Sequence, residues 1–414
     1  AALDGNWDLQ AAARRLQAAV IQAEMTASGK FPTVTGGLNA NESRRNFVGM
    51  PFPGAEDRVL TNTSFNSGVS LDVSWEPDIW GKFSAREIGA RADMEAVKAD
   101  VRAARLSMIG QVCKAWFSII EARQQVELAE ESLESYRDTA SRLTRRYEMG
   151  IQGSLDYRLA LTSVAGAEAN LEQRRQAFRQ LVRQLEILLG EYPDAGLNTS
   201  DRMPDLPELP GAGVPSELVS RRPDLVSLEL AMLSAGAGWA EARTALYPSF
   251  NIAGSLGTST DNFLKIFNPD YFIWSVAGSV IQPIFNGGRL RAQVEMQDAV
   301  AAQAASSWAG AVLAAFREVE TALDAEEFLA DQENALSEAT RQSAAALELA
   351  RNRYEEGLTG FVTVLESQRR SLDSESSLLA IRRQRLDNRI DLHLALGGGL
   401  ENSEREDPDE EISS

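Results

Sequence analysis

The chain has 414 residues, of which 41 are Lys or Arg and 60 are Asp or Glu, so its formal net charge is −19. This acidic balance argues against nucleic acid and anionic lipid as main partners, because both attract clustered Lys and Arg. The single cysteine, Cys113, excludes a disulfide within the chain. We find no continuous run of about 18 apolar residues, so we expect no transmembrane helix.

A long internal repeat organises the sequence. The motif RYEMG at 146–150 returns as RYEEG at 353–357, an offset of 207 (353 − 146), and LLG at 188–190 returns as ALG at 395–397 at the same offset. A unit of this length is too long for a small-repeat solenoid, so we interpret the chain as an internally duplicated module.

The repeat divides the chain into four predicted segments. These are a first repeat over 1–200, a Pro-rich linker over 201–221, a second repeat over 222–400 and an acidic, disordered tail over 401–414. The chain begins at Ala1, so we expect a processed, trimmed or incomplete N-terminus.

Each repeat predicts the same series of a helix, two strands, a very long helix, a break and a shorter helix. In chain order the first repeat gives a helix at 8–29, strands at about 31–42 and 66–77, and helices at 84–148 and 155–190. The second gives a helix at 223–246, strands at about 248–258 and 272–283, and helices at 290–355 and 362–397. We expect the two shorter helices of each repeat to stack end to end beside the long one.

The far part of the first long helix carries a heptad seam, which predicts coiled-coil packing. Its members are Val126, Ala129, Leu133, Tyr136, Ala140, Leu143 and Tyr147. A weaker seam follows in the second repeat, at Leu336, Thr340, Ser343, Leu347, Ala350 and Tyr354. A helix buried in an ordinary bundle would explain the spacing equally well.

The predicted strands alternate apolar and polar side chains, which fits either a half-buried soluble sheet or a membrane strand. The apolar positions of one strand are Val69, Leu71, Val73 and Trp75. The polar positions are mostly Ser, Thr, Asn and Gly, and aromatic residues gather near the strand ends, which favours a membrane barrel. Four strands cannot close in lipid, so the chain must oligomerise, with two copies giving eight strands and three giving twelve.

Four motifs in a fixed order carry a family resemblance. They are RPDL at 222–225, ALYPS at 245–249, QPIFNGG at 282–288 and RYEEG at 353–357. Over about residues 6–400 the chain resembles the TolC-type outer membrane efflux proteins, in the OprM-like branch that serves resistance-nodulation-division (RND) pumps.

The resemblance implies a fold that is mainly α-helical with a membrane β-barrel. Each chain of a homotrimer would give four strands to a twelve-stranded barrel in the Gram-negative outer membrane and helices to a coiled-coil tunnel across the periplasm. The implied function is a passive exit duct, with a periplasmic adaptor protein, an inner-membrane RND transporter and outer membrane lipid as partners. The resemblance implies no enzymatic activity, no cofactor and no metal.

The resemblance also places the gate and the docking tips. The tips for adaptor or pump contact are the helix breaks, Gly150 to Gly153 and Gly357 to Gly360. The constriction candidates are Tyr354, Tyr147, Glu366, Asp156 and Thr363. Three copies of a carboxylate around a narrow axis would attract cations and disfavour anions. Alternatively, Asp156 and Glu366 stand in the first turn of a helix, where the helix dipole stabilises them.

Two other functions remain open at this point. One is the exit duct of a type I protein secretion system. The other, from a different class, is a soluble coiled-coil scaffold or adaptor with a small β domain, which predicts that Val69, Leu71 and Val73 are buried.

Overall fold

The computed structural model describes residues 2–47, 59–197, 200, 202–209 and 215–398. These residues form two compact units. Unit 1 comprises Ala1–Leu16, Val97–Ser227 and Trp308–Ser414, and unit 2 comprises Gln17–Ala96 and Leu228–Ser307. The predicted acidic tail and part of the predicted linker lie outside the described residues.

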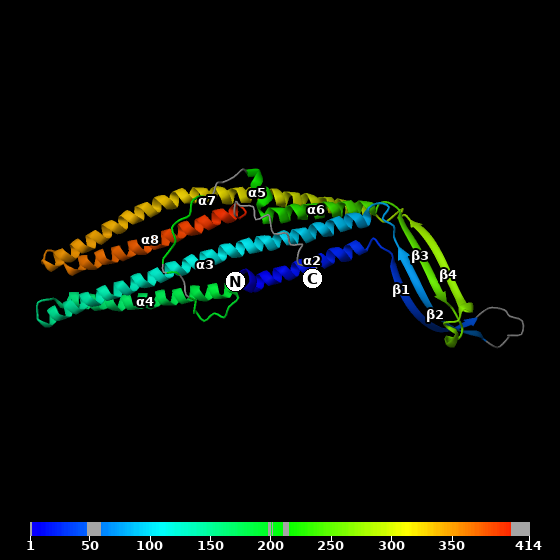
Figure 1. Cartoon of the computed structure of the whole chain (residues 1–414), viewed down its shortest axis with the longest axis horizontal. Coiled ribbons are helices and arrows are strands. Elements are labelled where there is room, and N and C mark those ends of the chain that lie inside the picture. Colours follow the sequence, from blue (N-terminus) through cyan, green and yellow to red (C-terminus); the bar gives the residue numbers. More distant parts are fainter. Residues whose placement is uncertain (1, 48–58, 198–199, 201, 210–214, 399–414) are drawn as a thin grey trace, which may run out of the picture. The chain divides into compact units, whose positions relative to one another are not determined.

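Unit 2 contains one antiparallel sheet with the strand order β1-β2-β3-β4 (Figure 1). The strands are β1 (Thr33–Phe47), β2 (Leu60–Trp75), β3 (Ser249–Thr258) and β4 (Phe272–Ile281). The pairing of β1 with β2 runs from Thr33–Ser74 to Phe47–Leu60, so this hairpin extends beyond the strand ends expected from alternation alone.

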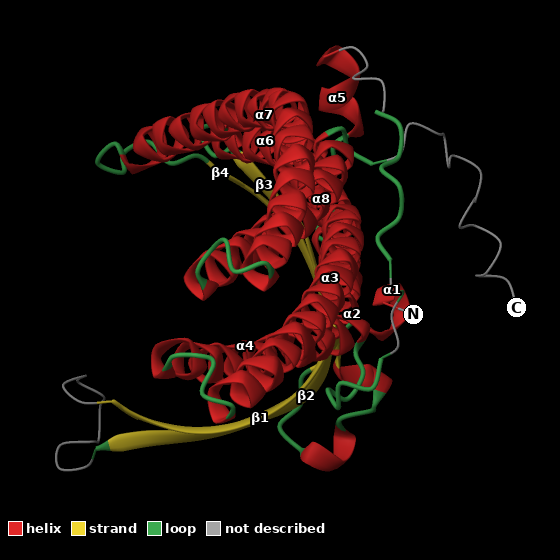
Figure 2. Cartoon of the chain, turned by 90° about the vertical axis from the view of Figure 1, so that its left-hand side faces the viewer, coloured by secondary structure: helices red, strands yellow, loops and turns green. Residues whose placement is uncertain are grey.

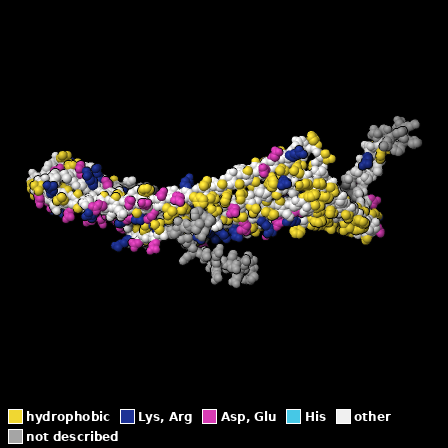
Figure 3. Space-filling view, turned by 90° about the horizontal axis from the view of Figure 1, so that it is seen from above, with side chains coloured by type: hydrophobic (Ala, Val, Ile, Leu, Met, Phe, Trp, Pro, Cys, Tyr) yellow, Lys and Arg dark blue, Asp and Glu magenta, His cyan; other side chains and the backbone are white. Residues whose placement is uncertain are grey.

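The register places most apolar side chains of the four strands on one face, with Ile273 and Ile281 of β4 among the exceptions. Leu71 lies opposite Leu256, and Leu256 lies opposite Trp274. This face is uncovered, with Trp274 and Val276 both 71% exposed, and Figure 3 shows hydrophobic side chains gathered over the strands. Leu71 is itself 44% exposed, which contradicts the burial that the soluble-scaffold hypothesis predicts.

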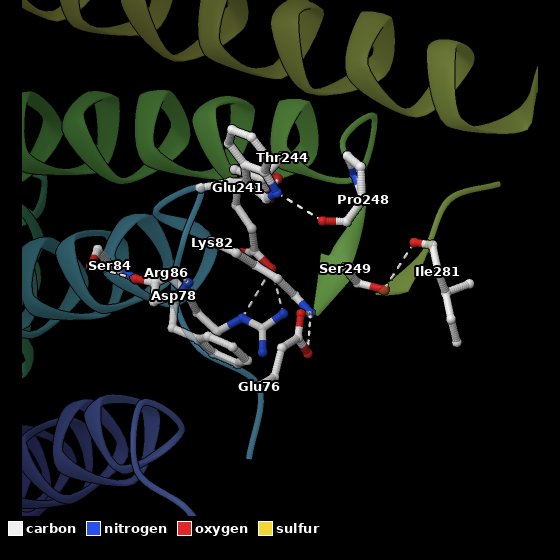
Figure 4. A network of polar contacts seen from close by, with 12 residues as sticks. Glu76, Asp78, Lys82, Ser84, Arg86, Glu241, Thr244, Pro248, Ser249 and Ile281 are labelled. Carbon is white, nitrogen blue, oxygen red and sulfur yellow. Dashed lines mark hydrogen bonds and ion pairs between the residues drawn. The ribbon is translucent and has the colours of Figure 1, made fainter. Parts of the chain in front are cut away.

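A polar network fixes the connections between strands and helices in unit 2 (Figure 4). The Asp78 carboxylate accepts hydrogen bonds from the N–H groups of Phe83 and Ser84 at 2.9 and 2.8 Å, which caps the start of α3 (Lys82–Glu148). Burial acts to raise the pKa of Asp78, but the Ser84 hydroxyl and these N–H groups outweigh it, so the pKa lies below its usual value. Arg86 forms an ion pair with Glu241, which joins α3 to α6 (Pro223–Thr244).

Unit 1 contains two helical hairpins. The first joins α3 to α4 (Ser154–Leu189), and the second joins α7 (Arg289–Glu355) to α8 (Phe361–Ala395). Short helices α1 (Ala2–Gly5) and α5 (Pro215–Arg221) lie outside the hairpins in sequence. The α3 seam is apolar and packs on α4, where Ala129 and Leu133 meet Ala167 and Leu171.

The end of each shorter helix meets the start of an earlier helix of the chain. The end of α4 meets the start of α2 (Trp7–Ser28), and the end of α8 meets the start of α6. Gly190, after α4, approaches Gly5 so closely that an added Cβ would lie 2.1 Å from the Gly5 carbonyl oxygen. The Asn6 side chain donates a hydrogen bond to Leu188 O at 3.0 Å and caps α2 by accepting from Leu9 N. Arg222 makes the corresponding contact before α6, because its guanidinium donates to Ala395 O at 3.2 Å.

A buried carboxylate attaches residues 195–197, which follow α4, to that helix. Glu186 accepts hydrogen bonds from the N–H groups of Ala195 and Gly196 at 2.9 and 2.8 Å and from Leu197 N at 3.3 Å. The side chain is 2% exposed, so these three donors replace the water that an ionised carboxylate needs.

We expected no segment able to cross a membrane, but helix α7 is long and apolar enough to do so. Helix α7 contains an 18-residue window with a mean hydropathy of 1.4, and only 6% of that window is buried. The expectation failed because Gln and Ser interrupt the apolar run, whereas Ala, Val and Leu keep the average high. Residues 299–316 of α7 contain no charged side chain.

Candidate functional site

The two hairpin tips have the same backbone geometry. Each long helix is followed by a glycine at positive φ, +72° at Gly150 and +76° at Gly357. Each shorter helix begins after an extended glycine, Gly153 or Gly360. Positive φ favours glycine because it has no Cβ, so the paired glycines make both breaks tight.

An apolar cluster next to the tips joins all four helices of unit 1. Its buried members are Ala140, Leu143, Ala160, Ala350, Phe361 and Val364. Phe361, the first residue of α8, is 1% exposed and its ring centroid lies 5.7 Å from that of Tyr354. This cluster holds the two hairpins together at the level of the predicted gate.

The Tyr354 hydroxyl points into this packing. It is buried, and within the described part of the chain it has no partner of normal hydrogen-bond geometry. Burial raises the pKa of Tyr354, and the charge of Arg146 only partly opposes this. Asp156 is also close enough to act on this pKa, so Tyr354 and Asp156 do lie near each other.

Tyr147 and Asp156, the candidates from the first repeat, lie at the tip between α3 and α4. Tyr147 is partly exposed, and its ring stacks on that of Tyr157 at a centroid distance of 4.8 Å. Asp156 stands in the first turn of α4 and accepts a hydrogen bond from the Gln152 side chain. The placement of Asp156 therefore agrees with the helix-start alternative.

Glu366 and Thr363 are exposed on α8. The helix begins at Phe361, so Glu366 is its sixth residue and the first turn contains no acidic side chain. The helix-start explanation of Glu366 is therefore wrong. Thr363 accepts a hydrogen bond from the Thr359 hydroxyl at 3.2 Å. Among the described residues, no hydrogen bond or ion pair joins Glu366 to Tyr354 or Asp156.

A groove of about 830 Å³ lies between the ends of α3 and α7. Basic side chains are prominent in its lining, which includes Arg142, Arg145, Arg146 and Arg351. Sequence reasoning did not identify this groove. The signal that could have found it is the spacing of Arg142, Arg145 and Arg146, which places them on one face of a helix.

Helices α3 and α8 lie side by side (Figures 1 and 2), and polar side chains meet between them at several levels. We call this the α3–α8 seam and define it by the pairs Lys114–Asp391, Glu121–Arg383, Gln125–Ser376 and Ser135–Gln368. Gln125 and Ser376 exchange two hydrogen bonds, of 3.0 and 2.8 Å.

Two carboxylates in the seam are energetically unfavourable when ionised. Burial raises the pKa of Asp387, although Arg383 is nearby. Burial and the charge of Glu131 raise the pKa of Glu375. Burial therefore disfavours the charged form of both carboxylates.

The constellation of a catalytic or metal centre is not present in this region. In the part of the chain that the structure describes, no group of three or more His, Cys, Asp or Glu side chains is placed to hold a metal ion. The features of this region are exposed tips, a shared apolar cluster and a polar seam.

Known proteins share this arrangement over almost the whole chain. The sequence profile of the family described as "Outer membrane efflux protein" matches residues 1–191 and 214–398. The chain belongs to this outer membrane efflux family. It is therefore an outer membrane protein, from a family of efflux channels rather than enzymes.

Individual relatives agree in sequence and structure. This efflux protein is 31% identical to the outer membrane protein OprJ of Pseudomonas aeruginosa over 96% of its length and 82% of OprJ. It is 26% identical to the cation efflux system protein CusC of Escherichia coli K12, over 96% of its length and 85% of CusC. It also resembles the open-state structure of the MtrE outer membrane channel of Neisseria gonorrhoeae, with a TM-score of 0.82 and 28% identity over 97% of this chain and 88% of that one.

Proposed function

We propose that this efflux protein is the passive exit duct of a tripartite RND-type pump. Three copies would combine their sheets into a twelve-stranded barrel in the outer membrane and their helices into a periplasmic tunnel. An inner-membrane RND transporter would supply the energy, and a periplasmic adaptor would connect it to the helical tips. Residues 1–200 and 222–400 would be two copies of one ancestral module.

The exposed apolar face of the sheet is the observation that carries this proposal. A face with Trp274 and Val276 uncovered suits lipid better than water. In the described chain β1 and β4 are the sheet edges, and open edges in lipid would leave backbone groups unsatisfied at several kcal/mol each. Closure by further copies removes both edges. The choice of three copies follows from the family resemblance.

A second surface supports association between copies. Residues 299–316 of α7 are rich in Ala and uncharged, and about half of them are exposed in the single chain, whereas Ala311, Val312, Ala315 and Phe316 pack on the core. Small side chains permit close helix–helix approach. A neighbouring copy that packs here would bury this stretch without stranding a charge.

The tips suit contact with a partner protein. Large apolar side chains are exposed at both breaks, namely Met149, Ile151, Leu155, Leu358 and Val362. Exposed apolar residues gathered on short loops are typical of protein-interaction sites. We therefore assign adaptor or pump contact to the tips that Gly150, Gly153, Gly357 and Gly360 shape.

We assign the gate to the adjacent level of the hairpins. Glu366 and Thr363 are exposed on α8 and are free to face the axis of an assembled tunnel, where three Glu366 carboxylates would favour cations. Tyr354 and Asp156 lie where the two hairpins meet, and Tyr147 is the first-repeat counterpart of Tyr354. In this arrangement the shared apolar cluster keeps the tip closed at rest.

The proposal is tested with the purified full chain in detergent and in planar lipid bilayers. Native mass spectrometry is expected to give a mass of three chains. Bilayers are expected to show small currents that prefer cations, and Glu366→Gln is expected to weaken that preference. A monomer that stays in solution without detergent and never conducts would overturn the duct.

The partner assignment has its own test. Leu358→Cys on a Cys113→Ser background provides a single thiol at one tip for photo-cross-linking in cells. Recovery of a periplasmic adaptor together with an RND transporter supports the assignment. Recovery of a type I secretion translocator instead would overturn the pump and keep the duct.

A further inference from the structure

One part of the sheet contains a single charged side chain, whereas the far part of the β1–β2 hairpin carries Glu42, Arg44 and Arg45. We take this part as β1 and β2 up to the Asn41–Asn66 pair, together with all of β3 and β4. Within residues 33–41, 66–75, 249–258 and 272–281 the only Asp, Glu, Lys or Arg is Asp72. A lone charge in such a neutral surface sets the local potential by itself.

The register places Asp72 on the polar face of the sheet. Asp72 lies opposite Thr35 on β1 and Ser255 on β3, and Ser255 lies opposite Ser275 on β4. Successive side chains of a strand point to opposite faces, so this row faces away from the apolar row of Leu71, Leu256 and Trp274. Four polar side chains therefore cross the whole width of the sheet at one level.

The Asp72 carboxylate is held in place and still open to water. The row forms one wall of a shallow groove of about 280 Å³ lined by hydroxyl groups and small residues. The Ser70 hydroxyl donates to the carboxylate at 2.8 Å, and the Ser255 hydroxyl also hydrogen-bonds to it. Asp72 is exposed, and two donors leave acceptor positions free on a group that can accept about four hydrogen bonds.

We propose that Asp72 is a specificity-determining residue that concentrates cations along the inner wall of the barrel. The inference rests on the proposed function, because the polar face becomes a lumen only when copies of the sheet close around it. Each copy would place one carboxylate at the same level of the lumen. Hydrated inorganic cations and amine-bearing cargo would be enriched there, and anions would be depleted.

The range of this effect follows from screening. The field of a carboxylate reaches about 10 Å at 0.1 M salt and about 30 Å at 0.01 M. In a wide lumen the ring therefore acts on ions near the wall at physiological salt and on the whole cross-section only at low salt. A purely structural Asp72, which only bonds Ser70 and Ser255, would leave no such salt-dependent signature.

The test measures the local potential with charged thiol reagents. Single cysteines are introduced into the full chain on a Cys113→Ser background, in lipid nanodiscs that leave both ends accessible. Ser255→Cys reports beside Asp72. Ser64→Cys reports on the same face of β2, eight residues away (72 − 64) or about 27 Å. Each is treated with a cationic and with an anionic methanethiosulfonate, and the ratio of the two rates is compared.

In 0.01 M salt we expect Asp72 to give an excess of about three- to tenfold in the cation-to-anion rate ratio at Ser255→Cys, and position 64, which lies near Arg45 of β1, serves only as the control for changing Asp72. Adding Asp72→Asn, which keeps the side-chain size, is expected to remove the excess at position 255 and leave position 64 unchanged. Asp72→Glu is expected to preserve it. A ratio at position 255 that ignores Asp72→Asn would overturn the proposal.

A third cysteine separates this inference from the proposed function. Val276→Cys lies on the exposed apolar face, and lipid is expected to shield it from both reagents. Fast labelling at position 276 would show that the sheet is not in lipid and would overturn the duct together with the role of Asp72. A shielded position 276 with no charge effect at position 255 would overturn the role of Asp72 alone.

Discussion

Helix α3 packs against α4 on one side and α8 on the other, and the chemistry of the two contacts differs. Toward α4 the contact is apolar, with Ile119, Val182 and Leu185 almost fully buried. Toward α8 it is the polar α3–α8 seam over residues 114–135 of α3, and it becomes apolar only near the tip, where Leu143 packs in the shared cluster with Phe361. Apolar contacts of this size stabilise by about 1.5–3 kcal/mol for each large side chain, whereas partly exposed polar pairs contribute about 1 kcal/mol or less.

The difference teaches which parts can move. A hairpin with an apolar interior would have to expose that interior in order to open. A polar seam can exchange its partners for water at low net cost, because water satisfies the same donors and acceptors. We therefore expect the hairpins to behave as rigid pairs and the seam to be the surface along which they separate.

The largest expected effect is inside a hairpin. Leu185→Ala should lower the free energy of unfolding by about 2–5 kcal/mol, because it leaves a cavity in the α3–α4 interior. Denaturant unfolding followed by far-UV circular dichroism measures it. Ile187→Ala, two residues further along α4 and exposed, is the control and should cost under about 0.5 kcal/mol. Equal losses in the free energy of unfolding at both positions would show that the α3–α4 interior contributes no more than the exposed surface of α4.

Breaking the seam should cost less. Arg383→Met removes the partner of Glu121 at 2.7 Å and of Asp387, and should lower the free energy of unfolding by about 1–3 kcal/mol. Arg175→Met, on an exposed α3–α4 ion pair with Glu130, is the matched control at under about 1 kcal/mol. A double-mutant cycle with Glu121→Gln measures the pair itself. No coupling in that cycle would show that the seam does not hold the hairpins.

A fall in pH should change the stability contributed by a seam carboxylate and by a hairpin carboxylate in opposite directions. The pKa of Glu375 in the seam is raised, so the folded state binds its proton more tightly, and stability rises as pH falls from the folded pKa toward the unfolded one. Within the α7–α8 hairpin, burial opposes but Arg385 and Arg382 outweigh it to lower the pKa of Glu333. Its contribution is therefore present above the unfolded pKa and is lost as pH falls through the folded one.

Thermal unfolding across mildly acidic pH tests these signs. Glu375→Gln should raise the melting temperature at neutral pH and remove the gain on acidification. Glu333→Gln should lower it at neutral pH and remove part of the acid loss. The opposite sign for either variant would contradict the assignment of that carboxylate.

The smallest effect is expected at Tyr354. Its buried hydroxyl has no partner of normal geometry, so Tyr354→Phe should change the free energy of unfolding by under about 0.5 kcal/mol or raise it slightly. Tyr354→Ala, which also removes the ring packed against Phe361, should cost several times more. A large loss in Tyr354→Phe would mean that the hydroxyl has a hydrogen-bond partner in the folded protein, such as Arg146.

Much of the fold was predictable because glycine and proline mark the element boundaries. The breaks at Gly150 to Gly153 and Gly357 to Gly360 give α4 and α8 starts at Ser154 and Phe361, within one residue of expectation. The far ends of β1 and β2 were not predictable, because residues such as Glu42 and Arg44 break the alternation while their backbones continue to pair.

The candidate site was predictable only as far as local sequence determines it. The tips were predictable from the glycines at the two helix breaks. Tyr354 and Asp156 flank the two breaks that the internal repeat had already aligned. The α3–α8 seam and the Arg-lined groove depend on which helix faces which across more than 200 residues of chain. Nothing in the sequence around Gln125 or Ser376 indicates that these two side chains hydrogen-bond to each other.

The end-to-end contact of Gly190 with Gly5 fixes the position at which α4 ends relative to α3. Helix α4 starts at one tip and stops against α2, while α3 runs past this joint without interruption. One residue inserted into α4 alone would displace its far end by about 1.5 Å and rotate it by about 100° relative to α3. The lengths of the interrupted and continuous helices must therefore change together, because the joint fixes the end of α4 relative to α3.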